Sequence, residues 1–541
     1  MNADDAYSEL NDAQRSAAGA LQGPVLVVAG PGTGKTLTIV SRIARLIQNG
    51  VSPQSILAVT FTNRAAREMH ERVTRRLGEA ARGIFIGTFH LLGLRILRDR
   101  LSGEFTLLGR DEQLDLLQGM LKGTRKEAQQ AGDRIARRKS SLDAEECSGS
   151  CPREFDDVYE AYQAALQQRN AVDFDDLIAI PIRLLEQDDD FARSYRARYQ
   201  HIIVDEYQDI NPAQYRLLRL LLNESGSLCA VGDADQAIYA FRGADPGNFL
   251  AFEQDFPRTR RVTLTHNYRS TGTILQAVHG VISRNPKRIE KQLTAVRERG
   301  ERVAVHSLPD DRSEAETIIR EIETRMGGTS HDQIRRNAAA RDRGACSYRF
   351  SDFAVIFRTN AQARTLEEAF RASGIPYQLI GRAGRAQSRE IEETTAFLRS
   401  ILRGEGSPDP HEAADLEARL LSPADRFDPR AEAVALMTMH MAKGLEFRVV
   451  FVAGCEDGLV PCTIMKDCTD VEEERRLFYV AMTRARDELL LLHARSRFLY
   501  GKRLVQQPAP FLADIPDSLT EQHMQQERKA AQKDRQMGLF S

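Results

Sequence analysis

The sequence contains no tryptophan, no long apolar run and almost no net charge. Its 541 residues carry 75 basic and 77 acidic side chains, a formal net charge of −2, so composition alone does not indicate a nucleic-acid-binding protein. No stretch approaches the roughly 18 uninterrupted apolar residues that a membrane-spanning helix requires. The N-terminus is polar and acidic, unlike a secretory signal. We therefore expect no membrane association and a cytoplasmic protein.

The seven cysteines are widely scattered, which argues against a disulfide framework. Cys147 and Cys151 are separated by three residues, and Cys455, Cys462 and Cys468 by six and five. No paired C-x₂-C spacing is present, so a zinc or iron–sulfur site is the minor alternative. We expect no metal held by cysteine.

What the sequence does contain begins with a short apolar, β-branched run, Val25–Ala29, which predicts a buried parallel strand. It leads into GPGTGKT and then into an amphipathic segment, Thr38–Gln48, that predicts a helix. Glycines let backbone N–H groups wrap around phosphate oxygens, and the helix N-terminus favours the same anions. The alternative is an ordinary Gly-rich turn. The order strand, loop, Lys-Thr and helix favours an ATP site formed by Ala29, Gly30, Pro31, Gly32, Thr33, Gly34, Lys35 and Thr36.

Within this loop, Lys35 is expected to reach the β- and γ-phosphates, and the Thr36 hydroxyl to ligate Mg²⁺. A second apolar run, His201–Val204, ends in two carboxylates. We expect Asp205 to hold Mg²⁺ through water and Glu206 to polarise the attacking water. Alone, the acidic pair would be as well explained by a helix N-cap.

The residues around these two segments resemble superfamily 1 helicases of the UvrD/Rep/PcrA family. The resemblance extends from Leu10 to about Leu519 and follows the family's motif order. It is carried by LNDAQRSA (Leu10–Ala17), VTFTNRAAREM (Val59–Met69), GTFHLLGLRIL (Gly87–Leu97), VDEYQD (Val204–Asp209), VGDADQAIYAFRGA (Val231–Ala244), LTHNYRS (Leu264–Ser270), FRTNAQARTLEEAF (Phe357–Phe370), GIPY (Gly374–Tyr377), VALMTMHMAKGLEFRVVFVAG (Val434–Gly454) and EEERRLFYVAMTRARDEL (Glu472–Leu489).

The resemblance implies further roles at the ATP site. It assigns the adenine to two residues, the ribose to one and the γ-phosphate to three, the two arginines acting as arginine fingers from the second motor domain. A surface ion pair is the ordinary alternative for each arginine. Leu37 departs from the family, which often has a base-contacting Arg there. The resemblance thus assigns the adenine to Gln14 and Tyr268, the ribose to Glu446, and the γ-phosphate to Gln236, Arg269 and Arg484.

The resemblance also implies a track for single-stranded DNA, built from aromatic stacking and backbone contacts. Phe241 stands where the family usually has Trp, which predicts weaker stacking. Core packing is the alternative for each aromatic residue, and it is less favoured for Tyr239 and Phe241 because their i, i+2 spacing next to Arg242 suits an exposed platform. The track comprises Phe61, Asn63, Thr88, Phe89, His90, Tyr239, Phe241, Arg242, Arg358, Asn360 and His440.

The implied fold class is α/β, with two RecA-like P-loop NTPase domains. We expect the first motor domain at residues 1–89 and 193–261, with a helical insertion at 90–192 that contains the basic stretch Lys122–Lys139. That stretch would contact duplex DNA or form a solvated helix face. The second motor domain is expected at 262–402 and 430–515. Only 27 residues, 403–429, stand where the family inserts its large 2B subdomain.

The tail, residues 516–541, is polar and ends in QMGLF (Gln536–Phe540), which is similar to short peptides that dock on the bacterial sliding clamp. A chance terminal hydrophobic pair is the alternative. We expect an ATP- and Mg²⁺-dependent, nucleoid-associated helicase that moves 3′→5′ on single-stranded DNA and at single/double-strand junctions, in repair or replication. The alternatives are a translocase that displaces proteins with little unwinding, and a non-catalytic clamp-tethered scaffold.

Overall fold

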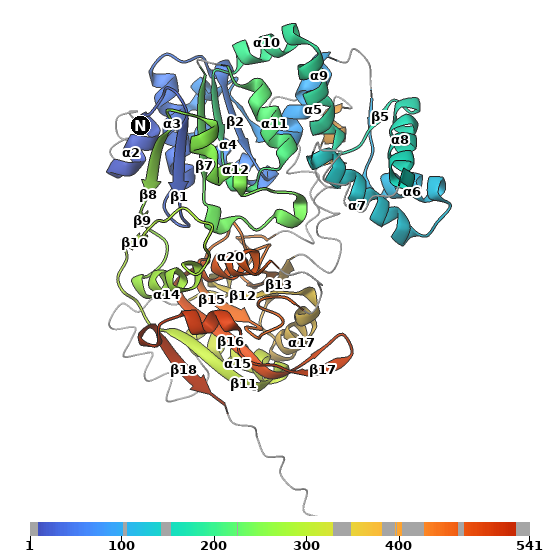
Figure 1. Cartoon of the computed structure of the whole chain (residues 1–541). Coiled ribbons are helices and arrows are strands. Elements are labelled where there is room, and N and C mark those ends of the chain that lie inside the picture. Colours follow the sequence, from blue (N-terminus) through green and yellow to red (C-terminus); the bar gives the residue numbers. More distant parts are fainter. Residues whose placement is uncertain are drawn as a thin grey trace, which may run out of the picture. The chain divides into compact units, whose positions relative to one another are not determined.

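The computed structural model describes residues 9–100, 105–141, 153–223, 226–327, 348–380, 395–396, 398–402, 427–463 and 470–525. The chain divides into two compact units. The first comprises Met1–Leu275, Asn285–Arg299 and Gly381–Arg426; the second comprises Gln276–Arg284, Gly300–Ile380 and Phe427–Ser541. Each contains a largely parallel sheet flanked by helices, which confirms the α/β expectation (Figure 1).

The sheet of the first unit has six described strands in the order β3-β2-β6-β7-β1-β8, all parallel. Parallel strands are usually buried on both faces, and five of these six are buried along their whole length. Because their carboxyl ends meet at one edge, the loops after β1, β6 and β7 gather there. The strands are β1 (Val25–Ala29), β2 (Ile56–Thr60), β3 (Phe85–Thr88), β6 (His201–Val204), β7 (Ser227–Gly232) and β8 (Arg260–Leu264).

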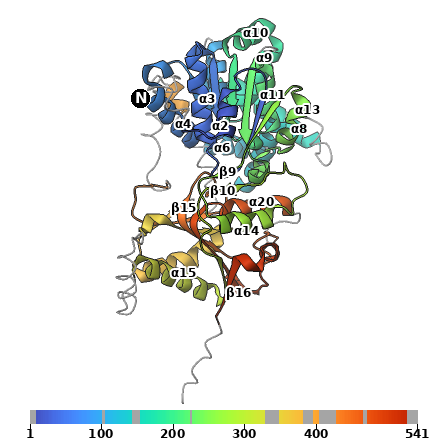
Figure 2. The ribbon, with the colours of Figure 1, turned by 90° about the vertical axis from the view of Figure 1, so that its left-hand side faces the viewer.

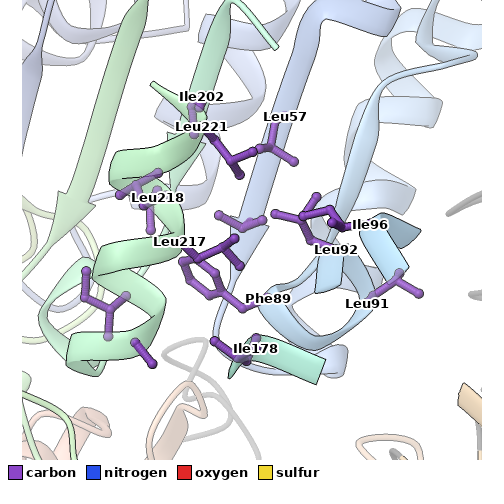
Figure 3. Close-up of a cluster of buried hydrophobic side chains, with 14 of the residues drawn as sticks. Leu57, Phe89, Leu91, Leu92, Ile96, Ile178, Ile202, Leu217, Leu218 and Leu221 are labelled. Carbon is purple, nitrogen blue, oxygen red and sulfur yellow. The ribbon is translucent and has the colours of Figure 1, made fainter. Parts of the chain in front are cut away.

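Helices cover both faces of this sheet. Alternate residues of β1 point to opposite sides, as the pleat requires, so that Val25 and Val27 join one core and Leu26 and Val28 the other. Figure 2 shows the helices of the first face, and Figure 3 shows part of the core on the second. The first face carries α2 (Asp12–Gly19), α3 (Lys35–Gln48) and α4 (Asn63–Leu77); the second carries α5 (Phe89–Arg100), α9 (Asp176–Gln187), α10 (Asp189–Arg198) and α11 (Pro212–Leu221).

The insertion between β3 and β6 is mainly helical, and α6 (Arg110–Leu121), α7 (Arg125–Ser141) and α8 (Arg153–Gln168) pack around their own core of Leu117, Ile135 and Tyr162. The basic stretch lies on α7. Several of its charges are paired within the insertion: Arg125 with Asp111, Arg138 with Asp156, and the buried Lys139 with Asp173 and Asp176. These ion pairs favour a helix face that does not contact DNA over the expected contact with duplex DNA. Short elements complete the unit: β4 (Thr106–Leu107), β5 (Ala171–Val172), α12 (Gly247–Leu250), α13 (Phe252–Asp255), β9 (His266–Asn267) and β10 (Thr294–Ala295).

The sheet of the second unit has the order β13-β14-β12-β15-β16-β11-β18, with β17 paired antiparallel to β16. Helices α15 and α17 pack on one face through a core that includes Phe353, Phe357 and Phe370. Helix α14 (Gly272–Ile282) contributes residues to both units. The remaining elements are β11 (Val303–Asp310), α15 (Asp311–Met326), β12 (Phe353–Phe357), α17 (Ala363–Ser373), β13 (Tyr377–Ile380), β14 (Val434–Thr438), β15 (Phe447–Ala453), α20 (Val471–Met482), β16 (Ala485–Leu499), β17 (Lys502–Val505) and β18 (Thr520–Met524).

Strands β1 and β6 have the bounds expected from the sequence. The two compact units divide the chain at positions other than the expected limits of the motor domains. The expected border at residues 261/262 falls inside β8, a strand of the first sheet, and residues 395–402, expected in the second motor domain, belong to the first unit. There Leu398 and Ile401 join the core, and Arg399 donates to the Leu107 carbonyl at 2.5 Å.

Two expected features lie outside the described residues: most of the shortened interval 403–429 and the clamp-like peptide Gln536–Phe540. Of the cysteines, Cys229, Cys455 and Cys462 lie in the described part of the chain, and all three are buried free thiols. None of the described helices has the length and apolar character needed to cross a bilayer.

Candidate nucleotide and DNA sites

The loop after β1 has the backbone of a phosphate cradle. Gly32 and Gly34 adopt left-handed conformations, with φ of 68° and 83°, which side chains of L-residues disfavour. A Cβ on Gly34 would also lie 2.5 Å from Nε2 of Gln14, so glycine is required there for space as well. The Thr33 hydroxyl donates to the Gly30 carbonyl at 2.8 Å and closes the turn. The loop backbone is therefore constrained immediately before the first turn of α3.

The two segments predicted to form the ATP site meet in the structure. Lys35, the first residue of α3, has its Nζ 3.1 Å from Oε1 of Glu206, just beyond β6. Glu206 adopts a left-handed conformation with φ 52°, which costs a non-glycine residue about 1–2 kcal/mol and so needs support from its surroundings. Its second oxygen, Oε2, accepts a hydrogen bond from Nε2 of Gln208 at 2.5 Å. The catalytic-type carboxylate is thus fixed beside the phosphate loop.

Asp205 and Thr36 supply oxygen donors of the kind that Mg²⁺ prefers. The buried Asp205 donates its backbone N–H to the Val59 carbonyl at 2.9 Å, and its Oδ1 accepts the backbone N–H of Glu206 at 3.0 Å. The carboxylate is therefore oriented by its own backbone neighbours. Asp205 and Thr36 fit the magnesium role expected of them, since Mg²⁺ typically takes one or two protein oxygens and completes its shell with water and phosphate.

The expected adenine-binding pair is joined through a residue that sequence reasoning missed, Asn11. Asn11 caps α2, and its side chain accepts the backbone N–H of Gln14 at 2.9 Å while Gln14 Oε1 accepts the N–H of Asn11 at 3.0 Å. Asn11 Nδ2 also donates to the Tyr268 hydroxyl at 2.8 Å. The Tyr268 ring is 44% exposed, as a stacking surface must be, whereas Gln14 is buried and its Nε2 donates to the Thr33 carbonyl at 3.0 Å.

Arg269 lies in the first compact unit. Its segment is hydrogen-bonded to the phosphate loop: the Tyr268 N–H donates to the Gly32 carbonyl at 2.9 Å, and Asn267 Nδ2 donates to the Pro31 carbonyl at 2.6 Å. Strand β8 of the first sheet ends at Leu264, and the segment that carries Arg269 follows it through β9.

Gln236 is buried in the turn after β7. Its Nε2 donates to Oδ2 of Asp233 at 2.7 Å, and the backbone N–H of Asp233 donates to Oε1 of Gln208 at 2.9 Å. Since Gln208 also holds Glu206, hydrogen bonds connect the turn that carries Gln236 to the carboxylate beside Lys35.

Two expected nucleotide residues lie in the second unit. The buried Arg484 donates from Nε to the Val480 carbonyl at 2.9 Å and from Nη1 to the Leu445 carbonyl at 3.1 Å. Glu446 is exposed, and Arg486 lies 3.4 Å from it. Arg484 therefore has a fixed guanidinium plane within its unit.

The expected DNA track begins with a group of aromatic rings in the first unit. Tyr239 stacks on Phe61, with ring centroids 4.9 Å apart, and Phe241 lies 5.9 Å from Tyr239. Phe241 is 46% exposed, so it offers the accessible face of this platform. Asn63 begins α4, two residues beyond Phe61. The side chain of Arg242 lies outside the described residues.

Phe89 was expected on the DNA track, and the structure contradicts this. The ring is only 3% exposed and packs in the core on the second face of the sheet (Figure 3). Its neighbours differ: Thr88 is buried and its hydroxyl accepts the Leu91 N–H at 3.3 Å, whereas the partly exposed His90 stacks on Phe174 at 3.9 Å. Thr88, Phe89 and His90 are adjacent in the sequence, but of the two rings only that of His90 is partly exposed to solvent.

The second unit contributes Arg358, Asn360 and His440 to the expected track. Asn360 is exposed and His440 half-buried. Arg358 is engaged in a forked ion pair with Glu474, at 2.9 Å from Nε and 2.6 Å from Nη2. Burial lowers the pKa of Arg358, but hydrogen bonding and charge from Glu474 outweigh it and raise the pKa. Glu474 is a second residue that sequence reasoning missed, because one Glu among three gives no pairing signal.

Comparison with known families agrees with this geometry. Residues 10–257 match the UvrD/REP helicase N-terminal domain, and residues 262–407 and 415–496 match the UvrD-like helicase C-terminal domain. The chain belongs to the UvrD-like helicase family. Its two parallel α/β units are accordingly RecA-like P-loop domains, as the sequence predicted.

Among curated relatives of this UvrD-like chain is the ATP-dependent DNA helicase PcrA of Staphylococcus aureus, 33% identical over 665 aligned positions that cover 97% of this chain and 88% of the relative. PcrA of Staphylococcus epidermidis is 31% identical over 659 positions, covering 96% and 88%. Both alignments contain more positions than this chain has residues, so both relatives have segments without a counterpart here.

Proposed function

We propose that this chain is an ATP-driven helicase that moves 3′→5′ along single-stranded DNA, acting in DNA repair or replication. The observation that carries the proposal is the contact between Lys35 and Glu206. It brings a phosphate-binding cation and a general base together at the carboxyl edge of a parallel sheet, where such folds bind nucleotides. The membership of the UvrD-like family supports the same reading.

ATP binding is proposed to exchange the partner of Lys35. The ammonium moves from Glu206 to the β- and γ-phosphates, and Oε1 of Glu206 then accepts a proton from the attacking water. Gln208 keeps hold of the other carboxylate oxygen, so the base stays oriented during the exchange. Mg²⁺, held through Asp205 and Thr36, would neutralise charge on the phosphate oxygens.

Arg269 and Arg484 are assigned to the charge that spreads over the transferring phosphoryl group, because a guanidinium fork matches its oxygens. Tyr268 would stack on the adenine and Glu446 would accept a hydrogen bond from the ribose. The DNA strand is assigned to the platform of Phe61, Tyr239 and Phe241 and to Asn63, His90, Asn360 and His440, with one nucleotide advanced per ATP by analogy with the family.

A second candidate function is a translocase that displaces proteins from single strands and separates duplex poorly. The observation that favours it is the length of the PcrA alignments, which gives the relatives segments that this chain lacks. The 27-residue interval 403–429 is the position we propose for the largest of these losses. A non-catalytic scaffold is disfavoured because Lys35, Asp205, Glu206, Gln236, Arg269 and Arg484 are all present.

ATP hydrolysis measured with and without single-stranded DNA tests the proposal, using wild type and Lys35→Ala. We expect DNA to stimulate hydrolysis and the substitution to abolish it. A 3′-tailed and a 5′-tailed duplex, assayed on the same preparation, then separate the two candidates: unwinding of the 3′-tailed duplex supports a helicase, and stimulated hydrolysis without unwinding supports the stripping translocase. Hydrolysis indifferent to DNA would contradict both.

A further inference from the structure

The side chain of Lys291 is buried between two carboxylates in the first unit. It lies in the segment between α14 and β10, and its Nζ is 2.5 Å from Oδ1 of Asp233 and also pairs with Oδ2 of Asp235. The Lys291 side chain is only 2% exposed. Burying a lysine is costly unless its charge is matched, and here both partners are buried with it. Burial lowers the pKa of Lys291, but Asp233 and Asp235 outweigh it and raise the pKa, so the side chain remains a cation.

The carboxylate that Lys291 holds is the one that orients Gln236. Asp233 Oδ2 accepts the Gln236 amide at 2.7 Å, while Oδ1 accepts both Lys291 and the backbone N–H of Asp235 at 3.1 Å. Without Lys291, a major constraint on rotation of the Asp233 carboxylate is lost. The side chain of Gln236 would then lose its fixed acceptor.

The same turn is connected to the catalytic carboxylate. Gln208 accepts the Asp233 N–H through Oε1 and donates through Nε2 to Glu206. The approach is close because residue 232 is glycine: a Cβ there would collide with Oε1 of Gln208. One more contact, between Lys35 and Glu206, completes a path from the phosphate loop to Asp233.

In the other direction the turn leads directly to the aromatic platform. Tyr239 follows Gln236 by three residues and stacks on Phe61. The segment of Lys291 also touches the phosphate loop, since a Cβ on Gly30 would lie 2.9 Å from the methyl groups of Leu293. The buried Lys291 thus anchors the turn that lies between the nucleotide site and the aromatic platform.

We infer that Lys291 is a positioning residue that couples the nucleotide site to the aromatic platform, by holding Asp233 and hence Gln236 in register with Glu206. The inference rests on the proposed function, because it concerns how DNA accelerates hydrolysis at that site. A purely structural lysine would stabilise the turn without affecting the coupling. The two roles differ in what DNA does to the hydrolysis rate of a folded variant.

The experiment is steady-state ATP hydrolysis by Lys291→Met, with and without oligo-dT, over a range of ATP concentrations. We expect the ratio of the DNA-stimulated to the unstimulated kcat to fall about tenfold, with the KM for ATP changed by no more than about twofold. Lys291→Arg, which keeps a cation between the carboxylates, should recover part of the ratio. The matched control is Arg288→Met, which removes the cation that donates two hydrogen bonds to Asp235 and leaves the Lys291–Asp233 pair. Its ratio should stay within about threefold of wild type.

Because Lys291→Met leaves a buried carboxylate unmatched, Lys291→Met/Asp235→Asn provides a charge-balanced partner, retaining Asp233 and Arg288. It should show the same loss of stimulation at a wild-type melting temperature. An undiminished ratio in this variant would overturn the inference, as would equal losses in stimulated and unstimulated rates. If wild type itself is not stimulated by DNA, the proposed function fails first, which is a distinct result.

Discussion

Tyr239 lies face to face with Phe61, their rings 4.9 Å apart and inclined by 18°. Phe61 follows β2 and Tyr239 lies in the loop after β7, so their stacking joins two distant parts of the sequence. Their stacking leaves Phe241 as the more exposed ring of the platform, at 46%. A base that enters this site would therefore meet Phe241 as well as the Tyr239 edge.

From this arrangement we predict that Phe241→Ala weakens binding of oligo-dT by about tenfold, since stacking on an aromatic ring is worth roughly 1–3 kcal/mol per base. Phe241→Trp should bind at least as tightly as wild type because it enlarges the stacking face. Fluorescence anisotropy at fixed salt measures both. Equal affinities for Phe241→Ala and wild type would remove Phe241 from the track.

Glu206→Gln should lower kcat for ATP hydrolysis by about 10²–10⁴-fold, the usual contribution of a general base. The amide retains a hydrogen-bonding group for Gln208 but cannot take a proton. Binding of a fluorescent ATP analogue should persist in Glu206→Gln and weaken in Lys35→Ala. A variant that hydrolyses ATP normally would show that another group activates the water.

The Arg358–Glu474 pair separates stability from DNA contact. Arg358→Gln leaves Glu474 buried without its guanidinium, and we predict a loss of about 3–5 kcal/mol in the free energy of unfolding. Arg358→Gln/Glu474→Gln should regain most of this stability, as shown by denaturant unfolding. If the stable double variant still binds oligo-dT weakly, Arg358 contacts DNA; if its binding is normal, Arg358 has only a structural role.

A pH-dependent stability is predicted at β18. Burial lowers the pKa of His306 to about 4, and electrostatic interactions with His523, Arg320 and Arg325 act in the same direction, while Glu321 opposes the shift. His306 stacks on His523 at 4.6 Å. Between the unfolded value near 6.5 and the folded value near 4, the unfolded chain binds more protons, so stability falls as pH falls through this window. His306→Gln should flatten the dependence of the melting temperature on pH between 7 and 4. An unchanged slope would assign that dependence to other groups.

We also predict that the terminal peptide Gln536–Phe540 docks on a bacterial sliding clamp. Deleting residues 536–541 should abolish clamp binding measured by surface plasmon resonance while DNA-stimulated hydrolysis is retained. Replacing Leu539 and Phe540 with Ala is the matched control for the apolar pair. Clamp affinity that survives the deletion would end the idea.

Sequence patterns predicted the parts of this structure in which local chemistry and tertiary environment agree. The runs of β1 and β6 are apolar, β-branched and bounded by motif residues, so their bounds matched. Phe89 was misplaced because likeness to a motif fixes a residue's position in the chain but not the direction of its ring. Lys291 was missed because a lysine in RIEKQL looks like any solvated residue until its two aspartates, 58 and 56 positions away, are brought to it.

The division of the chain has a consequence for any attempt to study its halves separately. The polypeptide passes between the two compact units five times, after Leu275, Arg284, Arg299, Ile380 and Arg426. Neither unit can be excised as a continuous gene fragment, and each contains cores assembled from distant stretches of sequence. Because each unit is assembled from three separate stretches of the chain, we expect a variant truncated after Leu275 to lose part of the first unit's fold as well as the whole of the second unit.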